Sequence, residues 1–139
     1  MSVYKKYKTS FTISFPGKGN GIRGDIPEAT AGIKVRSAPN DGYEEEIVRW
    51  KGWLGEGPRE ESNCDKQRCY TFRIRVEYDK QGNIKSALYG KIYDDFDLSS
   101  LDGVRFLYYL NPTPNDRNLE WDMKNNLCPK PGDIGNPRP

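Results

Sequence analysis

Among the residues of this chain, the acidic ones are the best candidates for catalysis. The sequence has 20 Asp and Glu residues and no His, so Ser-His-Asp and Cys-His arrangements are excluded. Glycoside hydrolysis needs only two carboxylates, and Glu44 to Glu46, Glu120 and Asp122 are candidates for such a pair. The distance between the two carboxyl groups decides that chemistry, and charges on the wet face of a strand are common. We therefore expect a protein without enzymatic activity.

A second acidic group, Asp94, Asp95 and Asp97, is the weak candidate for a metal site. Calcium takes six to eight oxygen ligands, but these residues lack the glycine and terminal glutamate of an EF-hand loop. We expect a solvated turn and no metal. The segment Gly19 to Gly24 has the letters of a dinucleotide fingerprint, but Asp25-Ile26-Pro27 follows where that motif needs a helix. The sequence therefore predicts no cofactor.

Three cysteines are present, and Cys64 and Cys69 flank a short polar loop. A disulfide between these two residues is one alternative, and two free thiols are the other. Cys128 remains as a third thiol. A structural zinc site is not expected, since it normally takes four Cys or His ligands.

The aromatic side chains, 12% of the residues, are the best candidates for binding. Trp50 and Trp53 are three residues apart, so on a strand they point to opposite faces. Arg73 and Tyr89 form a predicted cation–π pair on the outward face of a hairpin. Exposed rings beside Arg and Lys suit stacking on sugars or unpaired bases, and equally suit a protein interface. We therefore take Trp50, Trp53, Arg73 and Tyr89 as the candidate ligand-binding residues.

These side chains depend on a hairpin centred on the strand Tyr70 to Tyr78, where apolar and polar residues alternate strictly. With Lys80-Gln81-Gly82 as its loop, the inward pairs are Tyr78 with Ile84, Val76 with Ser86, Ile74 with Leu88, Phe72 with Gly90 and Tyr70 with Ile92. The outward pairs are Glu77 with Lys85 and Arg73 with Tyr89. A slip of one residue would bury lysines in the core, so the alternation fixes the register.

Further strands are predicted at 11–15, 33–36, 46–53 and 104–110, with a last one over 119–123. The strand 104–110 is apolar at nearly every position, which predicts a central or doubly covered strand. We expect irregular chain at 17–24 and at 55–68. Six to seven short strands with no helix predict an all-β fold, a single antiparallel β-sandwich, with a partly open β-barrel as the alternative.

The organisation follows from length and composition. The 139 residues fit one β-domain over 1–127 and a Pro- and Gly-rich tail over 128–139. No apolar run is long enough for a membrane span, and the first residues lack the apolar stretch of a signal peptide. The cysteine pair, the tail and the low apolar content favour an extracytoplasmic location over a cytoplasmic one. The oligomeric state stays open.

The expected function is a non-catalytic binding or interaction module for a carbohydrate or protein ligand. The net charge of +2 is small for a nucleic-acid binder, so that partner is not expected. A small glycosidase-like enzyme and an oligonucleotide-binding barrel are the alternatives.

Overall fold

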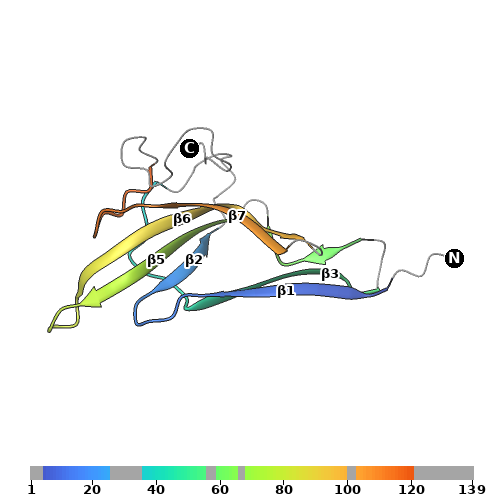
Figure 1. Cartoon of the computed structure of the whole chain (residues 1–139), viewed down its shortest axis with the longest axis horizontal. Helices are drawn as coiled ribbons and strands as arrows, with labels where there is room; N and C mark the ends of the chain where they lie inside the picture. The colour runs from blue at the N-terminus through green and yellow to red at the C-terminus, as the bar shows by residue number, and fades with distance from the viewer. Residues whose placement is uncertain (1–4, 26–35, 56–58, 66–67, 100–102, 121–139) are drawn as a thin grey trace.

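The computed structural model describes residues 5–25, 36–55, 59–65, 68–99 and 103–120. These residues form strands and no helix, in two antiparallel sheets (Figure 1). The three-stranded sheet has the order β1-β3-β4, with β1 at Tyr7–Ser14, β3 at Glu46–Trp53 and β4 at Glu61–Ser62. The four-stranded sheet has the order β2-β5-β6-β7, with β2 at Gly21–Asp25, β5 at Cys69–Tyr78, β6 at Ile84–Ser99 and β7 at Gly103–Leu110. The predicted all-β antiparallel sandwich is confirmed, and the described strands do not close into a barrel.

The main core lies between the two sheets. Alternation along β5 turns Tyr70 and Phe72 toward the three-stranded sheet, where both are buried. The Phe72 ring stacks on Phe15, with ring centroids 5.8 Å apart. Phe11 of β1 meets Phe96 of β6 edge to face at 5.1 Å. Full burial of an aromatic side chain stabilises a fold by about 2 kcal/mol, and Tyr70, Phe72 and Phe96 are buried here, so these contacts hold the two sheets together.

A second apolar cluster covers the other face of the four-stranded sheet. It contains Ala38, Ala87, Tyr89, Tyr109 and Leu119, all buried. Two segments outside the strands supply its cover, and they are joined to each other by an isolated bridge between Ser37 and Asn118. The hairpin face that the sequence predicted to be outward is therefore covered.

The hairpin register is confirmed at five pairs and wrong at two. Tyr70, Phe72, Arg73, Ile74 and Tyr78 oppose the predicted residues. Arg75 then adopts a left-handed conformation with φ of 54°, and a bulge follows Ile74. As a result, Glu77 faces Ser86, so the predicted pairs of Val76 with Ser86 and Glu77 with Lys85 do not form.

The bulge is stabilised by polar and apolar contacts. Val76 packs against the second cluster instead of the main core. Its backbone N–H, released from the ladder, donates to Asn20 Oδ1 at 3.1 Å. A second irregularity before Tyr78 restores the register at the loop, where Gly82 has a φ of 84°. The Asn20 contact explains how a ladder hydrogen bond is replaced.

Two further sequence predictions need correction. Residues 17–24 were expected to be irregular, but Gly21–Asp25 forms β2, because Ile22 is fully buried against β5. The acidic residues Asp94 to Asp97 were expected in a turn, but they continue β6. They form a bulge there, since the pair Tyr93–Leu107 is followed by Asp97–Arg105.

The remaining expectations concern the loops and the chain ends. The predicted loop at 55–68 contains the short β4. Leu119 is buried, but the chain around it forms only the isolated bridge at Asn118. Residues 33–35 and 121–123 of the other two predicted strands, and the tail at 128–139, lie outside the described residues. Across the described residues, no helix is long and apolar enough to cross a membrane.

Candidate interaction surface

The two tryptophans lie on opposite faces of β3, as their spacing predicts, and both are half-buried. Trp50 is on the outer face of the three-stranded sheet, where Lys8 Nζ lies 4.7 Å from the centroid of its ring. Its backbone N–H donates to Asn63 Oδ1 at 2.7 Å. The lysine occupies one face of the ring, so Trp50 does not offer an open platform for a sugar.

Arg73 and Tyr89 oppose each other in the ladder, but they do not form an exposed pair. Tyr89 is buried in the second cluster. The Arg73 guanidinium instead lies over the ring of Tyr43, 4.5 Å from its centroid. Arg73 Nε donates to the carbonyl of Gly19 at 2.7 Å, and its Nη1 donates to that of Asn40 at 3.1 Å. Arg73 therefore links β5 to two loops through these hydrogen bonds. The four predicted binding residues do not form one site.

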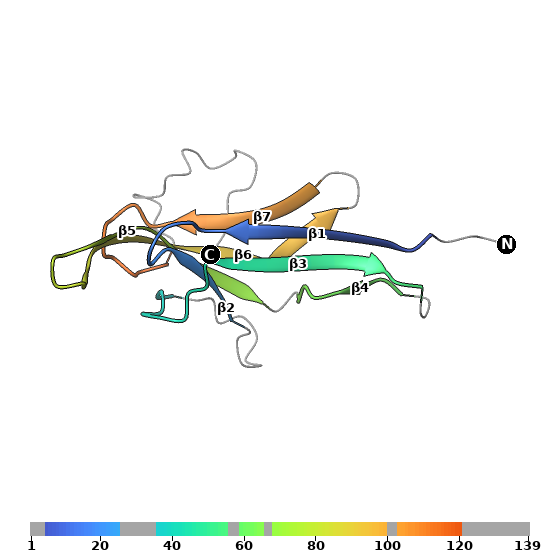
Figure 2. The same ribbon diagram turned by 90° about the horizontal axis from the view of Figure 1, so that it is seen from below.

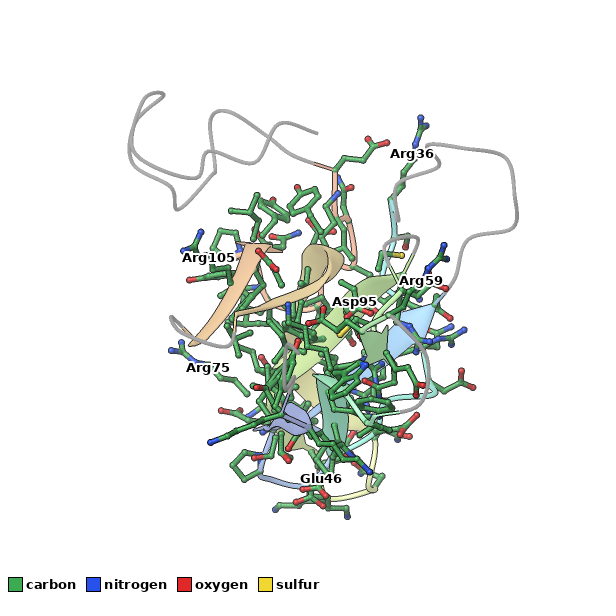
Figure 3. All side chains as sticks on the ribbon, turned by 90° about the vertical axis from the view of Figure 1, so that its right-hand side faces the viewer. Arg36, Glu46, Arg59, Arg75, Asp95 and Arg105 are labelled. Carbon is green, nitrogen blue, oxygen red and sulfur yellow. The ribbon has the colours of Figure 1, made fainter. Side chains whose placement is uncertain are left out.

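Among the three candidate metal ligands, Asp95 has a different role. Its side chain is 4% exposed and lies in the middle of the molecule (Figure 3). The Tyr70 hydroxyl donates to Asp95 Oδ1 at 2.6 Å, and the Asp65 backbone N–H donates to its Oδ2 at 2.7 Å. Asp97 is exposed, and the side chain of Asp94 lies outside the described residues. Within the described part of the chain, no group of three or more Asp, Glu, Cys or His residues is arranged to hold a metal.

Two arginines accompany the Asp95 carboxylate in the core. Arg49 Nε donates to the Tyr70 hydroxyl at 2.6 Å and lies 3.7 Å from Asp95 Oδ1. Arg68 Nε lies 3.9 Å from Oδ2. Burial, followed by the hydrogen bond to Asp95, raises the pKa of Tyr70 well above its usual range. This network of Arg49, Tyr70, Asp95 and Arg68 links the two sheets, and the Asp95 carboxylate lies within ion-pair distance of both arginines.

The carboxylates considered for glycoside hydrolysis do not converge either. Glu46 is exposed at one end of the view in Figure 3, and Arg36 is at the other. Glu120 pairs with that arginine, at 3.5 Å between Arg36 Nε and Glu120 Oε1. Glu46 and Glu120 therefore do not form a catalytic pair in this structure, and Asp122 lies outside the described residues.

Cys64 and Cys69 are not joined by a disulfide in the structure. Cys69 begins β5 opposite Asp25, and its Sγ donates to the carbonyl of Asp25 at 3.5 Å. The structure thus corresponds to the thiol alternative for these two residues. Cys128 lies outside the described residues.

Three consecutive exposed apolar residues lie on β7. Phe106, Leu107 and Tyr108 are 43%, 46% and 57% exposed. Phe106 and Tyr108 point into the open margin of the space between the sheets, where Phe106 contacts Phe96 at 5.4 Å and Tyr108 contacts Phe72 at 6.4 Å between ring centroids. The prediction of a central strand at 104–110 is wrong, because β7 ends the order of its sheet.

The backbone of β7 also has a free edge. The Asn111 N–H donates to the carbonyl of Tyr89 on the neighbouring strand at 2.9 Å. Backbone N–H and C=O groups alternate in direction along a strand. Those of Leu107 and Tyr109 therefore face β6, and those of Phe106, Tyr108 and Leu110 point to the free edge. No other strand of the described chain pairs with this side.

The other three sheet edges are formed by β1, β4 and β2 (Figure 2). Strand β1 presents Lys8, Ser10, Thr12 and Ser14 on its outer face. Strand β4 has only two residues. On β2, Ile22 exchanges two backbone hydrogen bonds of 2.9 Å with Glu44. Short length, lysines and pairing with a loop are common ways to block strand addition. Of the four edges, β7 alone combines full length with a continuous apolar surface.

The surface on β7, defined here as Phe106, Leu107 and Tyr108, was missed as a site in the sequence. Its apolar run was interpreted as burial on both faces. The absence of charge, Pro and Gly from 106–110 was the available signal, because an edge strand of that composition invites pairing with another chain.

The chain matches no protein-family model, and no curated protein or solved structure is significantly similar to it.

Proposed function

We propose that this protein is a non-catalytic interaction module that binds a protein partner through the β7 surface. The observation that carries the proposal is the coincidence of three exposed apolar side chains with unpaired backbone groups on one edge strand. A strand added there would gain main-chain hydrogen bonds and would cover Phe106 and Tyr108 at the same time. The main-chain hydrogen bonds require a polypeptide partner.

A protein ligand is favoured over a carbohydrate for a structural reason. Sugar binding usually needs an accessible aromatic face, and Lys8 covers one face of Trp50. Tyr89 is buried and Arg73 is held by backbone carbonyls. The arrangement of these candidates supports a role in folding, so we do not retain carbohydrate as an equal alternative.

Site-specific photo-cross-linking, in the cells that naturally make this protein, tests the proposal. Benzoylphenylalanine replaces Tyr108, and a control replaces Tyr7, which is also an exposed tyrosine on an edge strand. We expect protein adducts from position 108 and not from position 7. Equal adduct patterns at both positions, or no adduct at 108, would contradict the proposed interaction surface.

A further inference from the structure

We infer that β7 pairs antiparallel with β7 of a second copy of this chain, around a twofold axis through Leu107, perpendicular to the four-stranded sheet. The inference rests on the proposed function, because it names the partner of the same surface. The two four-stranded sheets then form one continuous sheet across the dimer.

Strand geometry restricts how two copies can pair. In an antiparallel ladder, residues directly opposite each other point to the same face of the sheet. A twofold axis perpendicular to the sheet keeps each main core on the same side, so inward residues must oppose inward residues. Phe106 and Tyr108 are inward, and their backbone groups also point to the free edge. A pairing of Phe106 with Tyr108 of the second copy satisfies both conditions.

The side chains of β7 fit this partner and register. Arg105 is the single charged residue of β7. In a register centred on Leu107, Arg105 opposes Tyr109 of the other copy, and the two arginines lie at opposite ends of the paired segment. Leu107 opposes its own copy, and Val104 opposes Leu110. Every residue from 104 to 110 thus has a partner without a like-charge contact, and the strand is complementary to itself.

The edges of the same molecule support this choice of partner. A protein that must stay monomeric blocks its long edge strands, as β1 is blocked here by Lys8 and its polar neighbours. On β7 the residues 106–110 carry no charge, although Phe106, Leu107 and Tyr108 among them are exposed. This contrast within one chain is expected where one edge is kept free for pairing.

Oligomeric state provides the first test. Light scattering of the purified full chain over a concentration series should approach twice the 16.0 kDa mass of the chain. Leu107→Arg places two arginines opposite each other at the axis and should return the monomer mass at every concentration. Val48→Arg is the matched control, since Val48 is also 46% exposed on a strand, and it should keep the dimer. Circular dichroism checks that both variants remain folded.

A cysteine cross-link tests the register. Leu107 forms a non-hydrogen-bonded pair with its copy, where the Cα atoms are about 4.5 Å apart, within the range for a disulfide. In a background with Ser at positions 64, 69 and 128, Leu107→Cys should form a covalent dimer on mild oxidation. Tyr108→Cys should not, because its copy lies two residues away across the axis. A covalent dimer through position 108 in place of 107 would overturn this register.

The outcomes separate the inference from the proposed function. A wild-type monomer that gives adducts with a different protein from position 108 would overturn self-pairing and keep the interaction module. A second outcome is a wild-type monomer that gives no adducts, together with a Leu107→Cys variant whose thiol does not react with a thiol reagent. That outcome would overturn both, because a segment of the chain itself would then cover β7. A dimer that survives Leu107→Arg would also overturn the inference.

Discussion

Asp95 and its two arginines place charge inside an apolar core. Removing one partner of a buried ion pair is costly, since it leaves the opposite charge uncompensated. We predict that Asp95→Asn lowers the free energy of unfolding by about 3 kcal/mol, measured by urea denaturation. Asp97→Asn, on an exposed side chain of the same strand, should change it by less than about 0.5 kcal/mol. Equal effects of the two variants would show that the network of Arg49, Tyr70, Asp95 and Arg68 is not needed for stability.

Buried tyrosines predict a stability limit at alkaline pH. Burial raises the pKa of Tyr43 and of Tyr93 to about 12, from an ordinary value of about 10. The folded pKa is above the unfolded one, so the contribution of each group is complete below pH 10 and is lost as the pH rises to 12. We predict falling stability across that window, and a late rise in tyrosinate absorbance that decreases in Tyr43→Phe.

Tyr93→Phe provides a comparison within the same experiment. The Tyr93 hydroxyl is buried without a hydrogen-bond partner among the described residues, whereas the Tyr43 hydroxyl donates to the carbonyl of Pro39 at 2.8 Å. Removing the first hydroxyl should leave stability at pH 7 unchanged or higher, and removing the second should cost about 1 kcal/mol. A greater loss in Tyr93→Phe than in Tyr43→Phe would contradict this assignment.

The role of a side chain could be predicted only where it depends on the residue opposite it in the hairpin. The opposition of Arg73 and Tyr89 follows from the hairpin register and is confirmed. Their burial was not predicted, because Ala38 and Leu119, which lie far from the hairpin in sequence, supply the cover. Asp95 was predicted in a solvated turn for the same reason, since its partners Arg49 and Tyr70 come from two other strands.

The bulge in β5 concentrates backbone strain at one position. Arg75 has a φ of 54°, a conformation that costs a non-glycine residue about 1 kcal/mol. We predict that Arg75→Gly leaves the free energy of unfolding unchanged or raises it by up to about 1 kcal/mol. Arg75→Val should lower it by more than 1 kcal/mol, because a branched Cβ is disfavoured further. Loss of stability in the glycine variant equal to that in the valine variant would contradict a left-handed residue here.

The elements themselves were largely predictable from alternation and turn residues. Strand Glu46–Trp53 has the predicted bounds, and the hairpin loop ends at the predicted left-handed glycine, Gly82. Alternation does not show a bulge, however, because the extra residue at Arg75 depends on the distant acceptor Asn20. The short β2 and β4 also escaped prediction, since both depend on pairing with another strand.

The order of strands within the sheets could not be predicted from the residue pattern of each strand. An apolar strand is equally compatible with a central place and with an unprotected edge, so 104–110 was predicted to be covered when it is exposed. The same residues form the candidate site, which explains why the site was missed while the fold class was predicted. A run without protective charge is therefore a reason to consider pairing between chains.

Self-pairing would couple the stability of the whole molecule to its concentration. A dimer that unfolds to two separate chains gains about 0.7 kcal/mol per chain for each tenfold rise in concentration above its dissociation constant. For a domain of this size, that corresponds to a rise in Tm of about 2 °C. We predict this dependence in calorimetry of the wild type and of Val48→Arg, and a constant Tm in Leu107→Arg. A constant Tm in the wild type over two decades of concentration, with monomer mass, would show that β7 does not pair with its own copy.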